Sequence, residues 1–154
     1  MSPEAEIPLA RLFAIAFRAL MDSVHTQLAA RGYPDVGSGF GYVLLQARER
    51  PLTGNDVAQL MGVTKQAASK LIDAMERARY LERHDNPEDA RSKLVRITPK
   101  GKRLLHTVEE IYRQLEGEWA EAIGARELSR LRSDLTRALR VLHGGSLPPV
   151  RPTS

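Results

Sequence analysis

The side chains that follow Thr64 include types that bind nucleic acid, and their spacing gathers them on one side of a helix. At about 100° per residue, four apolar side chains fall within about 40° of one direction: Ala68, Leu71, Met75 and Ala78. The opposite arc carries Lys65, Gln66, Ser69, Lys70, Asp73, Glu76 and Arg77. Glutamine can pair with adenine through two hydrogen bonds, and lysine can reach guanine or a phosphate. An ordinary surface helix with a solvated charged face has the same pattern, so this helix alone leaves both interpretations open.

Two acidic residues, Asp73 and Glu76, lie on the same arc as the candidate DNA-binding side chains. A carboxylate facing DNA would repel the phosphates. We expect these two either to form salt bridges with Lys70 or Arg77 or to lie away from bound DNA.

Catalytic and metal-binding patterns are absent from the sequence. It contains no Ser-His-Asp set, no glycine-rich phosphate loop and no carboxylate pair in a clear structural context, so we expect neither an enzyme nor catalytic residues. The chain has no cysteine, which excludes disulfides and thiolate nucleophiles. Its four histidines, at positions 25, 84, 106 and 143, lack the spacing of metal ligands, so no metal and no cofactor are expected.

A shorter helix is predicted directly before the one that begins at Thr64. Thr53 and Asp56 lie three residues apart and resemble a capping box at its start. Gly62 can take a positive φ at its end, and Thr64 can cap the next helix. Helix, glycine turn and second helix within about 25 residues match a helix-turn-helix. A helical hairpin without any role in DNA binding would look similar.

A charged hairpin is predicted after the second helix. Short strands are expected over 80–83 and 94–98, and the polar, turn-rich run 84–93 between them is too charged to bury. Arg91 and Lys93 near the tip could enter a minor groove, where negative potential attracts basic side chains. The alternative is a solvated hairpin without a ligand, but the adjacent pair of helices favours a DNA-binding wing.

Residues 52–101 resemble the winged helix-turn-helix of the MarR family of transcriptional regulators. Four matches at the family's spacing carry the resemblance: the Leu52-Thr53 helix start, the Thr64-Lys65-Gln66 opening of the second helix, the Asp89-x-Arg91 signature of the wing, and Ile97-Thr98-Pro99-Lys100-Gly101 after it. This segment is about a third of the chain, and the helical flanks extend the resemblance to nearly all of it.

The resemblance implies a role for each matched residue. Arg91 would reach the minor groove, and Asp89 would hold the tip of the wing in shape. Thr53 and Asn55 would lie close to phosphates. The side chains that would face the major groove are Lys65, Gln66, Ser69 and Lys70.

The cationic excess of the chain lies in residues 65–103, the predicted second helix, the hairpin and the residues just after it. Residues 65–103 hold 11 Lys or Arg and 6 Asp or Glu, a net charge of +5, whereas the whole chain carries +4 and the remainder therefore −1. Such localisation is typical of a nucleic-acid interface. No long apolar run or signal-peptide pattern is present, so we expect a cytoplasmic protein that does not bind a membrane.

The flanks are predicted to be helical. Helices are expected over 8–31, 40–47 and 99–123, and Gly124 separates the third from a last helix with a leucine stripe at Leu128, Leu131, Leu135, Leu139 and Leu142. These stripes exceed what one winged helix can cover, which favours a two-fold dimer, with a monomeric helical bundle as the alternative.

The expected fold is mainly α with a small β-hairpin wing, a winged helix-turn-helix flanked by N- and C-terminal dimerisation helices. The dimerisation region would comprise 1–34 and 99–145, the DNA-binding region 35–98, and a disordered tail 146–154.

Resemblance and pattern together predict a homodimeric, sequence-specific DNA-binding transcriptional regulator, most often a repressor in this family, on a palindromic site in double-stranded DNA. The alternative is a winged-helix module that binds a partner protein without sequence-specific DNA binding. The resemblance also implies that a small-molecule effector binds between the dimerisation helices and the winged region and releases the operator. Candidate ligand-binding residues are Phe17, Arg18, Met21, His25 and Gln46.

Overall fold

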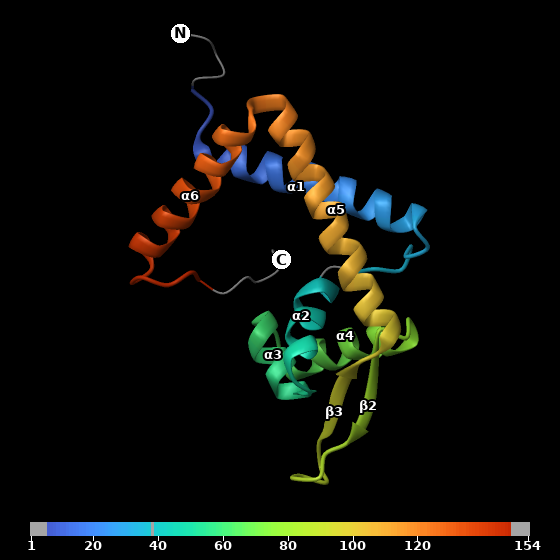
Figure 1. Cartoon of the computed structure of the whole chain (residues 1–154). Helices are drawn as coiled ribbons and strands as arrows, with labels where there is room; N and C mark the ends of the chain where they lie inside the picture. The colour runs from blue at the N-terminus through green and yellow to red at the C-terminus, as the bar shows by residue number, and fades with distance from the viewer. Residues whose placement is uncertain (1–5, 38, 149–154) are drawn as a thin grey trace.

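The computed structural model describes residues 6–37 and 39–148, and shows them as helices and three short strands (Figure 1). In chain order the elements are α1 (Leu9–Ala30), α2 (Phe40–Glu49), β1 (Leu52–Thr53), α3 (Gly54–Met61), α4 (Lys65–Arg77), β2 (Leu81–Asp85), β3 (Lys93–Ile97), α5 (Pro99–Ile123) and α6 (Ala125–Leu142). Within those ranges no helix is long and apolar enough to cross a membrane. Most of the predicted tail, residues 149–154, lies outside the described residues.

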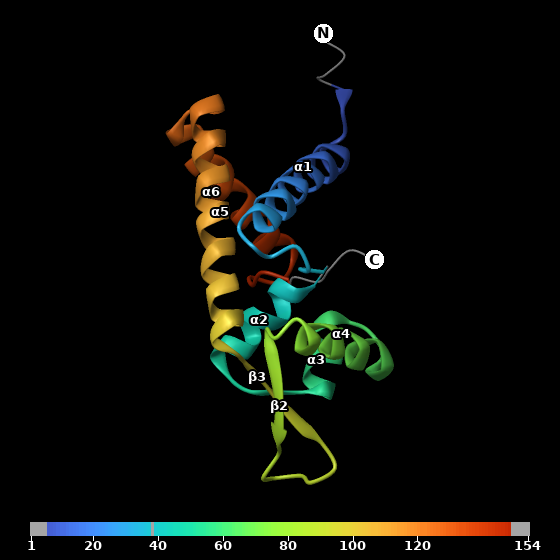
Figure 2. The same ribbon diagram turned by 90° about the vertical axis from the view of Figure 1, so that its right-hand side faces the viewer.

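The helices and strands form two parts joined by α5. The first part, the winged layer, packs α2, α3 and α4 against the sheet, and the β2–β3 hairpin projects from it. The long helix α5 leads from this layer to the opposite end of the molecule, where it meets α1 and turns back into α6 (Figures 1 and 2). The hairpin and α6 therefore lie far apart in both views, with α5 as the connection between them.

Local hydrogen bonds explain where the helices of the winged layer begin and end. The Thr53 hydroxyl accepts from the Asp56 backbone N–H at 3.1 Å, and the Asp56 carboxylate accepts from the Thr53 N–H at 2.9 Å. This reciprocal pair is the predicted capping box, and it holds the pKa of Asp56 below its usual value, mainly through the Thr53 backbone bond. Gly62 ends α3 with φ 65°, and the Thr64 hydroxyl caps α4 by accepting from Ala67 N–H.

The sheet contains one strand more than the sequence predicted. Its order is β1-β3-β2, all antiparallel, with Leu52 paired to Val95 on one side and Arg83 paired to Val95 on the other. The Leu52-Thr53 pair, predicted as a helix start, first adds a two-residue strand to the sheet and only then caps α3. Two residues cannot show a period-2 alternation, so this strand had no signal in the sequence.

The hairpin is also longer than predicted, because β2 continues to Asp85 and β3 already begins at Lys93. Lys93 was expected near the tip of the loop. It is instead the first residue of β3, paired across the hairpin with Asp85. An ion pair between these two charged residues stabilises pairing where the side-chain pattern alone predicted a loop.

The core lies in the winged layer and under α5. Leu44, Met75 and Tyr80 are fully buried there, and α1 contributes Val24 and Leu28 from its C-terminal half. By contrast, α6 contains no buried residue, and the N-terminal half of α1 exposes Leu9, Leu12, Phe13, Ile15 and Phe17. In one chain these two apolar helix faces remain uncovered.

Candidate nucleic-acid interface

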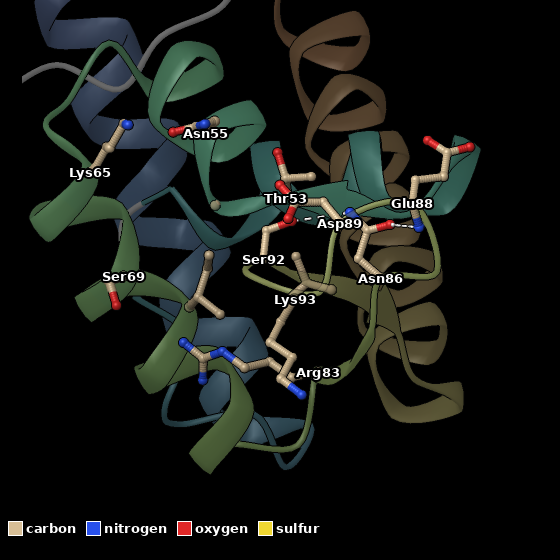
Figure 3. Close-up of a pocket in the computed structure, with 13 residues that line it drawn as sticks. Thr53, Asn55, Lys65, Ser69, Arg83, Asn86, Glu88, Asp89, Ser92 and Lys93 are labelled. Atoms are coloured by element: carbon tan, nitrogen blue, oxygen red, sulfur yellow. Dashed lines mark hydrogen bonds between the residues drawn. The ribbon is translucent and has the colours of Figure 1, made fainter.

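A groove of about 600 Å³ separates the wing from the N-terminal ends of α3 and α4 (Figure 3). Five of the eight predicted DNA-binding residues line it: Thr53, Asn55, Lys65, Ser69 and Lys93. They come from β1, α3, α4 and β3, so elements up to 40 residues apart in the sequence supply one surface. These five supply hydroxyl, amide and ammonium groups, which bind phosphates. The groove is also lined by two carboxylates of the wing, Glu88 and Asp89, and by the apolar Ile72 and Val95.

The remaining three predicted residues lie outside the groove but are exposed. Gln66 and Lys70 occupy neighbouring turns on α4, whose opposite side buries Ala68, Ile72 and Met75 in the core. This burial fixes the rotation of the helix, because turning it would bring lysine into the core. Gln66 and Lys70 therefore extend the polar surface along α4.

Arg91 lies at the tip of the wing, where the backbone is shaped by two side chains. The Asp89 carboxylate accepts from the Arg91 backbone N–H at 2.9 Å. The Asn86 side-chain oxygen accepts from the Glu88 N–H at 3.0 Å (Figure 3). Asn86 also donates to the Ser92 hydroxyl. Asp89 thus holds the tip in shape, as the resemblance implied. The Arg91 side chain is 93% exposed, and its Nε lies 3.5 Å from Asp89, so its charge is available to a ligand.

Lys93 pairs more closely with its carboxylate than Arg91 does, and its side chain is less exposed, 57% against 93%. Its ammonium forms an ion pair with Asp85 across the hairpin. The hydrogen bond from Lys93 is the main cause that lowers the pKa of the Asp85 carboxyl. A phosphate at Lys93 would have to compete with this carboxylate.

Arg83 is a residue of the groove that the sequence did not point to. Its guanidinium extends from β2 toward α4 (Figure 3). There Nη2 lies 2.7 Å from the Asp73 carboxylate and Nη1 lies 2.9 Å from that of Glu76. Asp73 and Glu76 therefore do not pair with Lys70 or Arg77, the expected partners on their own helix. Burial lowers the pKa of the guanidinium, but the two acidic hydrogen bonds outweigh burial and the pKa is raised. Only the packing of β2 beside α4 reveals this pairing.

The predicted ligand-binding residues lie in two places. Phe17, Arg18, Met21 and His25 follow one another along α1; Arg18 pairs with Asp22 at 3.5 Å, and the His25 ring hydrogen-bonds the Met21 carbonyl at 2.8 Å. Gln46 instead lines a hollow of about 270 Å³ between α2 and α3, together with Arg50, Leu52, Asp56, Gln59 and Leu60.

Comparison with known sequences relates the winged segment to one family. A family model described as MarR family matches residues 42–92. The curated HTH-type transcriptional regulator BilQ of Clostridioides difficile is 30% identical over 71 residues, which cover 46% of this chain and 48% of that protein. The chain thus aligns with about half the length of this relative.

Solved structures share the fold over most of the chain. The reduced form of E. coli MarR superposes with a TM-score of 0.74 at 24% identity, covering 86% of this chain and 97% of that one. A mutant of E. coli MarR complexed with operator DNA gives a TM-score of 0.67 at 23% identity, covering 86% and 94%. The S. aureus MepR-DNA complex gives 0.68 at 22% identity, covering 90% and 100%. At these identities the likeness concerns the fold.

Proposed function

We propose that this chain, whose residues 42–92 match the MarR family model, is a winged helix-turn-helix transcriptional regulator of that family, a homodimer that represses transcription from a palindromic operator in double-stranded DNA. The observation that carries this proposal is the groove between wing and helices, which gathers Thr53, Asn55, Lys65, Ser69 and Lys93. Two proteins of the same fold, E. coli MarR and S. aureus MepR, have structures with DNA bound.

In this proposal α4 lies in the major groove and the wing reaches the adjacent minor groove. Lys65, Gln66, Ser69 and Lys70 would contact base edges and phosphates from α4. Thr53 and Asn55, beside the start of α3, would contact the phosphate backbone. Arg91, exposed at the wing tip, would enter the minor groove, where its guanidinium meets the negative potential of the groove floor.

The proposed dimer would use the two helix faces that one chain leaves uncovered. On α6, Leu139 and Leu142 are 41% and 77% exposed, and on α1 the side chains of Leu9 to Phe17 are similarly open. Covering this apolar surface with a second copy would remove it from water, which is the main driving force for association. A two-fold dimer would then present two copies of α4 to two half-sites about one helical turn apart.

We also propose that a small molecule relieves repression by binding between α1, α5 and the winged layer. Arg18 and His25 on α1 are the polar side chains that would recognise an anionic compound. Effector coupling of this kind is typically about 1–3 kcal/mol, which corresponds to roughly 5- to 150-fold weaker DNA binding.

The direct test is binding to the DNA that flanks the gene of this protein, measured by fluorescence anisotropy with labelled duplexes. A palindrome in that DNA should bind at least about 1000-fold more tightly than a scrambled duplex. Contact with roughly eight phosphates per dimer predicts a slope near −7 when log K is plotted against log salt concentration. Equal, weak affinity for both duplexes would contradict the proposal and favour a winged helix that docks a protein partner.

A further inference from the structure

One guanidinium connects the wing to helix α4. Arg83 Nη2 lies 2.7 Å from Asp73 and Nη1 lies 2.9 Å from Glu76, while the second oxygen of Glu76 accepts from the Arg83 backbone N–H at 3.1 Å. The side chain of Arg83 is 29% exposed, so the cluster is partly shielded from water. A planar guanidinium that bonds two carboxylates has a defined direction, which a single flexible ammonium would not have.

The cluster lies at a position from which it can affect the direction of the wing. Arg83 is the middle residue of the five-residue strand β2, and its strand partner on β3 is Val95. Asp73 and Glu76 are three residues apart on α4 and so face the same side. The cluster therefore joins the last two turns of α4 to the centre of the hairpin, and the wing tip beyond it has no comparable bond to α4 among the described residues.

The same cluster removes an electrostatic conflict. Arg83 lines the groove together with Ser69 and Ile72 of α4. Two unmatched carboxylates beside this groove would repel phosphates, whereas the guanidinium reduces the local charge from −2 to −1 and draws both acids toward β2. Acidic residues on the DNA-facing arc of α4 are thus compatible with DNA binding.

We propose that Arg83, clamped by Asp73 and Glu76, is a positioning residue that fixes the angle between the wing and α4, so that one duplex meets both the N-terminal half of α4 and the wing tip. The proposal rests on the proposed function, because it assigns Arg83 a role in DNA binding. Arg83 acts here through the direction of the hairpin and not by a phosphate contact of its own.

The first experiment measures the wing angle without DNA. The chain has no cysteine, so Arg77→Cys and Ala90→Cys allow spin labels to be placed on α4 and on the wing tip alone. Dilution with unlabelled protein isolates the distance within one chain. We expect a narrow distance distribution in the otherwise unchanged protein and a broad one after Arg83→Gln. Glu82→Gln, which removes a neighbouring charge of β2 outside the cluster, should leave the distribution narrow. An unchanged width in Arg83→Gln would overturn the clamp.

The second experiment separates positioning from direct contact by keeping Arg83 and removing its acids. Asp73→Asn with Glu76→Gln preserves the shapes and deletes two negative charges. A phosphate-contacting Arg83 would then bind DNA more tightly. A positioning Arg83 predicts at least tenfold weaker binding, with hydroxyl-radical protection lost in the flanking minor grooves and retained at the centre of each half-site. Arg83→Lys keeps the positive charge but lacks the planar guanidinium that bonds both carboxylates. Its DNA affinity should fall between those of the double variant and the unchanged protein.

The outcomes distinguish the clamp from the function on which it rests. Failure of the unchanged protein to bind DNA would contradict the proposed function, while the distance distributions would still decide whether Arg83 fixes the wing. Specific binding that becomes tighter in the double variant, with a narrow distribution, would overturn the clamp and leave the proposed function standing. If Arg83→Gln does not fold, the isosteric double variant provides the same distance comparison.

Discussion

At the scale of single residues, three basic side chains near the wing differ in how far their charge is already matched. Arg83 is held by two carboxylates and Lys93 by one, whereas Arg91 is 93% exposed and lies at 3.5 Å from its one carboxylate partner, Asp89. DNA that binds Arg83 or Lys93 must displace the carboxylate already paired with that side chain. Binding to Arg91 breaks only a long, exposed contact with Asp89. Residue type alone would have treated all three as equivalent.

Arg91→Ala should therefore weaken operator binding by about tenfold, which corresponds to about 1.4 kcal/mol. Lys93→Ala should have a smaller effect, because the Lys93 ammonium is already paired with Asp85 and has less charge to offer DNA. Anisotropy titrations measure the affinity, and thermal unfolding should change little, because both side chains are exposed and an exposed ion pair such as Lys93–Asp85 contributes little to stability. Equal losses for the two variants would contradict this ranking.

Arg79 illustrates a different constraint on a single residue. It follows α4 with φ 66°, and among the described residues it is the non-glycine with a positive φ. A left-handed backbone costs an L-residue about 1–2 kcal/mol, and a β-branched side chain fits worst. We expect Arg79→Val to lower the free energy of unfolding by about 1–2 kcal/mol relative to Arg79→Gly. Denaturant unfolding of the two variants measures this, and equal stability would mean that the turn is not strained.

At the scale of elements, the C-terminal end of α4 is fixed by the start of α5. The Lys100 ammonium donates to the Ala78 carbonyl at 2.9 Å, and the Thr98 hydroxyl donates to the Arg79 carbonyl at 2.6 Å. A cation at a helix C-terminus also matches the helix dipole. The helix proposed to read DNA is thus attached directly to the long helix that leads to α6.

Gly101 permits the close packing of this junction. A Cβ at Gly101 would overlap the carbonyl oxygen of Tyr80, whereas a Cβ at Gly117, further along α5, would meet open space. Gly101→Ala should lower the free energy of unfolding by about 1–3 kcal/mol, and Gly117→Ala should raise it by about 0.5–1 kcal/mol. Thermal or denaturant unfolding compares the pair. A Gly101→Ala protein as stable as Gly117→Ala would contradict the close approach.

At the scale of the whole molecule, the winged layer and the helices at the opposite end differ in how much of their apolar surface is buried. The winged layer has a buried core from α2, α3, α4 and the sheet, but none of the leucines of α6 is buried. Within one chain the winged layer has its own buried core, whereas apolar side chains of α1 and α6 stay exposed to water. This asymmetry is what a dimer of two DNA-reading halves requires.

Leu139→Asp should accordingly convert the proposed dimer to a monomer, because it places a charge in the proposed apolar interface and disturbs little within one chain, where Leu139 is already exposed. Ser133→Asp, on the opposite side of α6, is the matched control and should remain dimeric. Sedimentation velocity measures the mass, and operator affinity should fall only for Leu139→Asp. A Leu139→Asp protein that sediments as a dimer would exclude this interface.

Much of the architecture could be predicted from local patterns. The resemblance of the winged segment to the MarR family and the mainly helical fold with a wing are confirmed. So are the capping box at Thr53, the Thr64 cap and the left-handed Gly62. The domain boundaries and the individual DNA- and ligand-binding residues stay predictions. The expected partners of Asp73 and Glu76, the position of Lys93 and the number of strands were wrong.

The sequence by itself determined the helices, their caps, the polar arc of α4 and the apolar stripes of α1 and α6, because each depends on contacts within a few residues or on a regular period. The tertiary structure alone decided that β1 joins the sheet, that five polar residues share one groove, and that Arg83 forms ion pairs with Asp73 and Glu76. These features join residues from different elements. Whether two such charges meet depends on how the elements pack, which no local pattern records.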